Sequence, residues 1–170
     1  MTISTCYDEK SLFSRLCLTC PDVWRAYCEH EFVERIGDGT LAIESFRHYL
    51  LQDYLFLIQF ARAHALAVYK TDDLDEMRVS SQALDNILRN EIHLHLSFCQ
   101  SWGITTAELA ELSEARANVA YTRYVLDKGV AGDSLDLHVA LIPCSVGYGV
   151  IGRRLKENLT PNNPYQVWID

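Results

Sequence analysis

A cysteine at the bend of a buried helix is the residue of this sequence best placed to act as a nucleophile. Cys144 directly follows Pro143 in an apolar stretch that runs from about Ser134 to Leu155. A proline inside a helix removes one backbone hydrogen bond and bends the helix. Tyr148 lies one turn after Cys144, on the same helix face. We expect the thiol and the phenol to point together into a cavity that the bend opens.

A carboxylate in a strongly apolar segment is the second group that could take part in binding or catalysis. Asp53 is surrounded by aromatic and aliphatic residues over positions 49–58. A helix that is apolar on all sides is buried, and a buried carboxylate must be paired or hydrogen-bonded. Phe56 lies on the same face, and this pair suits a flat, nitrogen-rich ligand whose ring stacks while the carboxylate accepts from its N–H groups. The alternative is a structural partner for Tyr49, Arg47 or a histidine.

A carboxylate and a histidine four residues apart form the best candidate for a metal site. Glu91 and His95 share one helix face, as some di-iron helical bundles require. Such sites need a second carboxylate–histidine set on other helices, and the sequence offers none in that pattern. A salt-bridged or hydrogen-bonded helix face is the alternative. We therefore expect no metal and no cofactor.

The remaining motifs are better explained by packing than by chemistry. The glycines of 147–152 match GxGxxG, but no strand precedes them, so we expect them to allow close helix packing. Cys17 and Cys20 form a lone CxxC without a second pair, which favours buried, reduced thiols. Tyr121 and Tyr124 follow helical spacing and, by that spacing alone, are core aromatics. Cys144 alone is likewise more typical of a small buried residue.

The elements that must position these groups are all predicted to be helical. Apolar residues recur at spacings of three and four almost throughout, and no segment reads as a strand. Residues 1–170 are expected to form one all-α domain of long antiparallel helices. We expect a loop at 36–40 and helices over about 8–29 and 43–69, then one whose N-cap and first turn lie at 71–73 and which runs to about Trp102. Further helices are expected after Thr105 or Thr106, over 113–128, from 134 to before Pro161, and from Pro164 onwards.

Composition and charge exclude several classes of protein. Hydrophobic residues make up 49% of the chain, which excludes disorder, and the formal net charge of −8 disfavours a nucleic-acid surface. We find no apolar run of the roughly 20 residues that span a membrane, and no secretory signal. The expected location is the cytoplasm, where the six cysteines stay reduced.

Several blocks of this sequence together resemble the TenA family of thiaminase II or aminopyrimidine aminohydrolases. Three motifs are specific when they are taken together, because their distances along the chain match those in the family. They are IGDGTL, LQD followed by tyrosine, and the proline–cysteine pair. The resemblance runs from about Asp8 to Asp170, and the blocks that carry it are residues 31–41, 46–56, 120–122, 141–148 and 164–169.

The resemblance implies a fold and a set of roles. The fold is a heme-oxygenase-like helical bundle, usually assembled as a homotetramer. Cys144 falls on the family's nucleophile, which adds to the electron-poor pyrimidine ring, and Asp53 on the carboxylate that hydrogen-bonds the ring nitrogen and exocyclic amine. Tyr121 falls on a tyrosine that hydrogen-bonds near the nucleophile, while Phe56 and Tyr148 fall on ring-stacking positions. The implied partner is a small aminopyrimidine, either thiamin or a degradation product of thiamin.

The final residues indicate that the domain continues beyond this sequence. Tyr165 to Asp170 read as the first turns of another amphipathic helix. The acid–base glutamate of the family belongs to a C-terminal region that this sequence does not contain, so we expect C-terminal helices to be missing. The function implied is hydrolysis of thiamin-related aminopyrimidines in thiamin salvage. Two alternatives are an inactive pyrimidine-binding protein and a metal-dependent oxidase on the same fold that uses Glu91 and His95.

Overall fold

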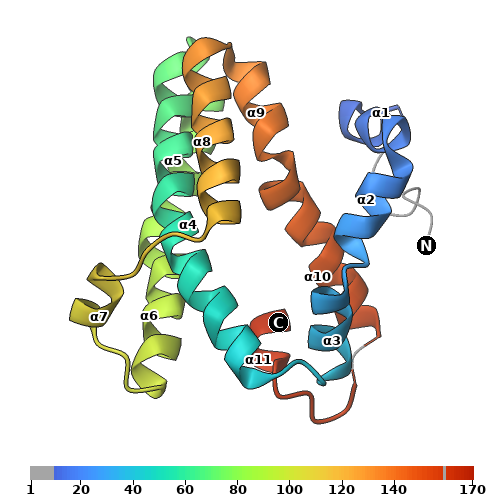
Figure 1. Ribbon diagram of the computed structural model, residues 1–170. Helices are drawn as coiled ribbons and strands as arrows, with labels where there is room; N and C mark the ends of the chain where they lie inside the picture. The colour runs from blue at the N-terminus through green and yellow to red at the C-terminus, as the bar shows by residue number, and fades with distance from the viewer. Residues whose placement is uncertain (1–9, 159) are drawn as a thin grey trace. The chain divides into compact units, whose positions relative to one another are not determined.

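The computed structural model describes residues 10–158 and 160–170, and these residues form helices and connecting turns without a strand (Figure 1). The all-α prediction is therefore confirmed. Two π-helical segments, η2 and η3, interrupt longer helical runs. The elements are α1 Leu12–Thr19, α2 Pro21–Cys28, α3 Glu31–Asp38, α4 Ile43–Lys70, α5 Leu74–Asn86, η2 Ile87–Glu91, α6 Ile92–Ser101, α7 Thr106–Ala110, α8 Arg116–Ala131, α9 Ser134–Ile142, η3 Pro143–Gly147, α10 Tyr148–Glu157 and α11 Gln166–Ile169.

Residues 43–141 form one compact unit built around the long helix α4. In Figure 1 helices α5 and α8 run beside α4, and α6 and η2 also pack against it. Small residues on α4 let the neighbouring helices approach closely, and burial of apolar side chains against them stabilises the unit. The core residues of this unit are Leu57, Ala61, Ala63, Ala67, Ile87, Val125, Leu137, Ala140 and Leu141.

The described residues up to Ala42, together with residues 142–170, form the other compact unit. Its α10 is fastened to the N-terminal helices by Arg154, whose guanidinium donates to the Cys28 carbonyl and pairs with Glu34, both at 2.6 Å. Asn163 fastens the C-terminal segment, because its amide donates to the carbonyls of Ile36 and Gly37 at 2.8 Å. This unit thus depends on polar contacts between residues far apart in sequence.

Local sequence signals explain most helix ends. Asp73 caps α5 by accepting from the backbone N–H groups of Asp75 and Glu76. Thr105 and Glu108 form a capping box at α7, and Gly103 takes a φ of 76° after α6, as expected of a helix stop. Of the residues predicted to form these caps, the structure selects Asp73 within 71–73 and Thr105 rather than Thr106.

Three boundary predictions are wrong, each for a local reason. The predicted helix over 8–29 is split into α1 and α2, because Pro21 cannot continue a helix and instead starts the next one. The predicted loop at 36–40 is mostly the end of α3, which stops at Gly39 with a φ of 79°. Helix α8 continues through Gly129, whose missing side chain lets Leu66 and Leu137 pack against the backbone.

The run from Ser134 to Glu157 corrects the expectation about membrane-spanning length. It is helical throughout and has a mean hydropathy of 1.4 over its most apolar 18 residues, so by length and composition alone it is long enough to cross a membrane. Leu137 and Leu141 of this run are buried in the core of the unit 43–141. Only 22% of that 18-residue window is buried, and helices of soluble proteins can have the same length and composition, so this single run does not by itself indicate a membrane span.

Candidate functional site

A buried carboxylate–histidine pair lies at the centre of the unit 43–141. Asp53 comes from α4 and His95 from α6, and Nε2 of His95 lies 2.9 Å from Oδ2 of Asp53. The side chains are only 3% (His95) and 12% (Asp53) exposed. The Tyr49 hydroxyl also donates to Oδ2, at 3.4 Å. Two of the three structural partners named for Asp53, Tyr49 and a histidine, thus bond to it, while Arg47 instead lies over the ring of Trp102.

The second ring nitrogen of His95 is held by the backbone of its own helical run. Nδ1 lies 2.8 Å from the carbonyl oxygen of Glu91, at the end of the π-helical turn η2. The carboxylate of Glu91 accepts from the side-chain amide of Asn86 at 2.8 Å, and burial raises its pKa. Glu91 and His95 therefore form a hydrogen-bonded helix face. Within residues 10–158 and 160–170, no group of three or more His, Cys, Asp or Glu side chains could hold a metal ion.

Aromatic rings stack on one another in the same unit, and one of them, Phe56, lies three residues after Asp53 on α4. Phe56 stacks on Phe60 at a centroid distance of 5.3 Å and on Tyr121 at 6.1 Å, with interplanar angles of 26° and 23°. The Tyr121 hydroxyl donates to the carbonyl of Ala140 at 2.9 Å. Phe56 is thus stacked on two rings of its own unit, and its stacking on a planar ligand stays a prediction.

Gln52 is a positioning residue that the sequence analysis missed. Its side-chain oxygen accepts from the backbone N–H of Ala115 at 2.7 Å, and its amide donates to the carbonyl of Ser113 at 3.1 Å. Asn118 in turn donates to the Gln52 carbonyl at 2.9 Å. Ala115 cannot cap α8 with its own side chain, so Gln52 supplies the cap from α4. The signal available in the sequence was a polar residue beside Asp53 in an apolar helix.

Cys144 lies in the π-helical turn η3 of the other unit, next to a tyrosine that the sequence analysis also missed. The hydroxyl of Tyr27 donates to the Pro143 carbonyl at 2.6 Å. Burial raises the pKa of Tyr27, and the neighbouring thiols of Cys144 and Cys28 raise it further. A side chain on Gly147 would lie 2.8 Å from the ring of Tyr27, so this glycine allows the close packing expected of it. Cys144 itself is half-buried.

The predicted site residues fall into the two units. Asp53, Phe56 and Tyr121 belong to residues 43–141, where Phe56 and Tyr121 are in contact and Asp53 is paired with His95. Cys144 and Tyr148 belong to the other unit, in which Tyr148 begins α10 and is 45% exposed. The shared orientation of Cys144 and Tyr148 remains a prediction.

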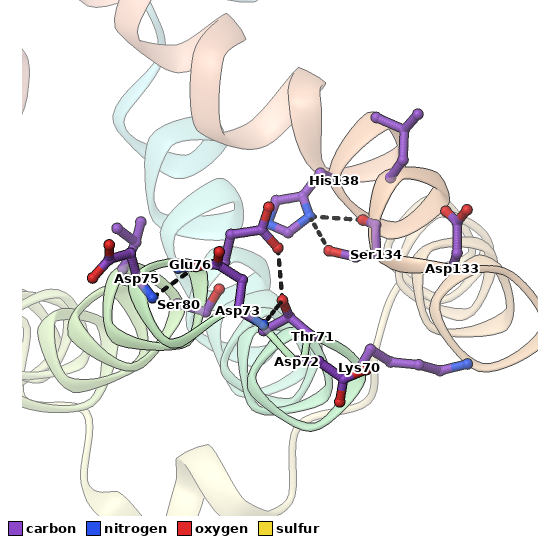
Figure 2. Close-up of a pocket in the computed structure, with 12 residues that line it drawn as sticks. Lys70, Thr71, Asp72, Asp73, Asp75, Glu76, Ser80, Asp133, Ser134 and His138 are labelled. Atoms are coloured by element: carbon purple, nitrogen blue, oxygen red, sulfur yellow. Dashed lines mark hydrogen bonds between the residues drawn. The ribbon is translucent and has the colours of Figure 1, made fainter.

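A separate surface pocket of about 780 Å³ lies in the unit 43–141 (Figure 2). Its polar groups bond to one another: Thr71 donates to Glu76 at 2.7 Å, and Nδ1 of His138 bonds to the Ser134 carbonyl, also at 2.7 Å. None of the predicted site residues lines it. The lining residues are Lys70, Thr71, Asp72, Asp73, Asp75, Glu76, Val79, Ser80, Asp133, Ser134, Leu135 and His138.

Comparison with known proteins gives a consistent match. The model of the TENA/THI-4/PQQC family matches residues 20–170. Over 149 residues, the chain is 45% identical to an uncharacterized protein of Haemophilus influenzae and 40% identical to an aminopyrimidine aminohydrolase of Halalkalibacterium halodurans. Each match covers 86% of this chain, and 69% and 66% of the two relatives, so the chain spans about two thirds of their length. The crystal structure of a TenA family transcription regulator from Silicibacter, 45% identical, superposes with a TM-score of 0.90 over 93% of this chain and 70% of that one.

Proposed function

Because the chain belongs to the TENA/THI-4/PQQC family, we propose that it hydrolyses thiamin-related aminopyrimidines. The observation that carries this proposal is the buried Asp53–His95 pair, with Phe56 three residues after Asp53 on α4 and stacked on Tyr121. A carboxylate beside flat aromatic surfaces suits a planar ring that carries N–H donors. The name of the Halalkalibacterium halodurans relative, an aminopyrimidine aminohydrolase, supports the same substrate class.

Asp53 would recognise the pyrimidine in this proposal. One of its oxygens is already held by His95, which orients the carboxylate. The carboxylate would accept from the exocyclic amine and hold the ring at its nitrogen, so that a proton on that nitrogen draws electrons from the ring. Phe56 and Tyr148 are assigned to stacking on the ring, and Tyr121 to hydrogen bonding near the nucleophile.

Cys144 would supply the nucleophile. Its thiolate adds to the electron-poor ring, and the amine leaves the exocyclic methylene as the ring electrons are released. Water then adds to the methylene, and the thiolate leaves again, so that an aminomethyl group and water give a hydroxymethyl group and ammonia. With thiamin as substrate, the thiazole is the leaving group. We place this activity in thiamin salvage and expect the enzyme to assemble as a homotetramer.

The test is ammonia release from a 4-amino-5-aminomethylpyrimidine. Cys144→Ser should abolish nearly all turnover with an unchanged circular dichroism spectrum, because a hydroxyl is a much weaker nucleophile than a thiolate. Cys20→Ser is the matched control, since Cys20 is an exposed thiol in the same unit. Undiminished activity of Cys144→Ser would contradict the assignment. Calorimetry that shows pyrimidine binding by the wild-type chain without ammonia release would instead favour a pyrimidine-binding protein.

A further inference from the structure

The hydrogen bonds of His95 determine where its protons lie. Nδ1 faces the carbonyl oxygen of Glu91 at 2.8 Å, and because a carbonyl only accepts, Nδ1 must carry a hydrogen. Nε2 faces Oδ2 of Asp53 at 2.9 Å, so one further proton must lie between these two atoms. A neutral imidazole with its proton on Nδ1 would direct the lone pair of Nε2 at the lone pairs of a carboxylate. The geometry therefore requires a shared proton in this buried contact.

We propose that His95 is a positioning residue whose protonated Nε2 fixes Oδ2 of Asp53 and so presents Oδ1 to the amino group of an aminopyrimidine. This inference rests on the proposed function and assigns to His95 a part in substrate binding. Both hydrogen bonds that the structure gives to the carboxylate, from His95 and from Tyr49, are made to Oδ2. Oδ1 is the oxygen left to accept from a ligand.

The charges around His95 favour its protonated form. Burial alone lowers its pKa, but the hydrogen bond and charge of Asp53 raise it, and the carbonyl and carboxylate of Glu91 add to this effect. The net result is a pKa above the ordinary value of 6.5. Among the described residues, Tyr49 of α4 and Glu91 of η2 are titratable groups that face the pair, and the formal charges of Asp53 and Glu91 beside His95 are both negative.

The proton makes substrate affinity depend on pH in a defined direction. At a pH below the raised pKa of His95, Nε2 donates and the carboxylate is held in place. Above that pKa, the neutral imidazole has one N–H for two acceptors, the Glu91 carbonyl and Oδ2 of Asp53, so one of the two hydrogen bonds is lost and Asp53 is held less firmly in its bound orientation. Affinity for the pyrimidine should fall as pH rises through the pKa of His95.

The pair can be examined first without any ligand. In ¹⁵N-resolved NMR spectra of the full chain, His95 should show two protonated ring nitrogens at pH 6.5. Asp53→Asn should lower the pH at which Nε2 loses its proton, because the negative charge is gone while burial remains. A wild-type His95 with an unprotonated Nε2 at pH 6.5 would overturn the inference, whatever the activity.

Two substitutions then separate positioning from packing. His95→Gln places an amide N–H close to the position of Nε2 and keeps a donor to Asp53 at every pH. His95→Asn reaches only the position of Nδ1, so it keeps the contact to Glu91 and loses the contact to Asp53. His93→Gln is the matched control, because His93 is exposed on the same helix, two residues away.

The readout is calorimetric binding of 4-amino-5-hydroxymethylpyrimidine, with ammonia release measured in parallel, from pH 6 to 9. We expect His95→Asn to weaken binding about 10- to 100-fold, as loss of a hydrogen bond to a charged group does. His95→Gln should bind like the wild type at pH 6 and without the alkaline decline. If the wild type binds and turns over while both variants match it at every pH, the inference is wrong and the proposed function stands. If the wild type neither binds the pyrimidine nor releases ammonia, the proposed function and the positioning role both fail.

Discussion

The hydroxyl of Tyr27 donates a hydrogen bond to the carbonyl oxygen of Pro143, at 2.6 Å. This bond connects α2 to the first residue of the π-helical turn that carries Cys144. Pro143 has no N–H, so the turn lacks a hydrogen bond that an ordinary helix would have. Tyr27 thus braces the turn from outside at the point where the helix is weakest.

Tyr27→Phe should destabilise the protein by about 1–2 kcal/mol, because it removes the donor and leaves the part-buried carbonyl of Pro143 without it. Urea unfolding followed by circular dichroism measures this free energy. Tyr69→Phe is the control, since Tyr69 is 83% exposed and its variant should unfold like the wild type. Equal stability of the two variants would show that the bond does not brace the turn.

Two glycines of the same helical run should respond oppositely to alanine. In Gly147→Ala the new methyl group would lie 2.8 Å from the ring of Tyr27, which its bond to Pro143 holds in place. We expect a loss of about 1–3 kcal/mol from this overpacking. Gly152→Ala meets nothing within 4 Å and should stabilise the helix, by up to about 1 kcal/mol. A comparison of their urea midpoints tests the contact directly, and stabilisation of both variants would contradict it.

Asn163→Ala should be among the most damaging polar substitutions. Asn163 is buried, its amide donates to the carbonyls of Ile36 and Gly37, and its oxygen accepts from the N–H of Tyr165. Loss of these three bonds should cost about 2–4 kcal/mol in thermal or urea unfolding. Asn162→Gly provides the control, because position 162 has a φ of 61° that glycine adopts without strain. An Asn163→Ala variant as stable as this control would refute the account.

Stability should vary with pH in opposite directions through buried His95 and half-buried His64. The pKa of His95 is raised, so its contribution is complete below about 6.5 and is lost as pH rises through the folded-state value. Burial and, to a smaller extent, the charge of His138 lower the pKa of His64 in the folded protein. As pH falls below 6.5, His64 therefore takes up a proton in the unfolded chain before it does so in the folded protein, and the folded protein loses stability. We expect urea unfolding at pH 5 to 9 to show that His95→Gln removes part of the fall in the free energy of unfolding at alkaline pH. His64→Gln should remove part of its fall at acidic pH. Unchanged slopes in both variants would refute the two assignments.

The sequence was sufficient for features that depend on neighbouring residues. The long helix α4, the cap at Asp73 and the capping box at Thr105 all follow from spacing and from residue types that lie within a few positions of one another. Helix boundaries were predicted wrongly where the same residue type can either end a helix or allow close packing inside one. Gly129 reads as a helix stop, yet it stays inside α8 because Leu66 and Leu137 need its missing side chain.

The partners of the candidate site residues depend on contacts that no local pattern contains. A histidine was one of three structural partners named as an alternative for Asp53, but His95 is 42 positions away, and only the packing of α6 against α4 selects it. Tyr27 and Pro143 are 116 positions apart, and neither carries a local sign of the other. The chemistry of these residue types could be predicted, whereas their partners required the fold.

The π-helical turn η2 makes the Asp53–His95 pair depend on the number of residues in α5–α6 as well as on their identity. A π-helical turn holds one residue more than the corresponding turn of an α-helix. Removal of exposed Leu88 would take out this extra residue, so the segment would become α-helical and His95 would keep its direction. The same deletion within residues 92–94 of α6, where no turn holds an extra residue, would instead rotate His95 by about 100° about the helix axis, away from Asp53. A single-codon deletion outside the site could therefore disable it, and alignments of this segment must be read for gaps as closely as for substitutions.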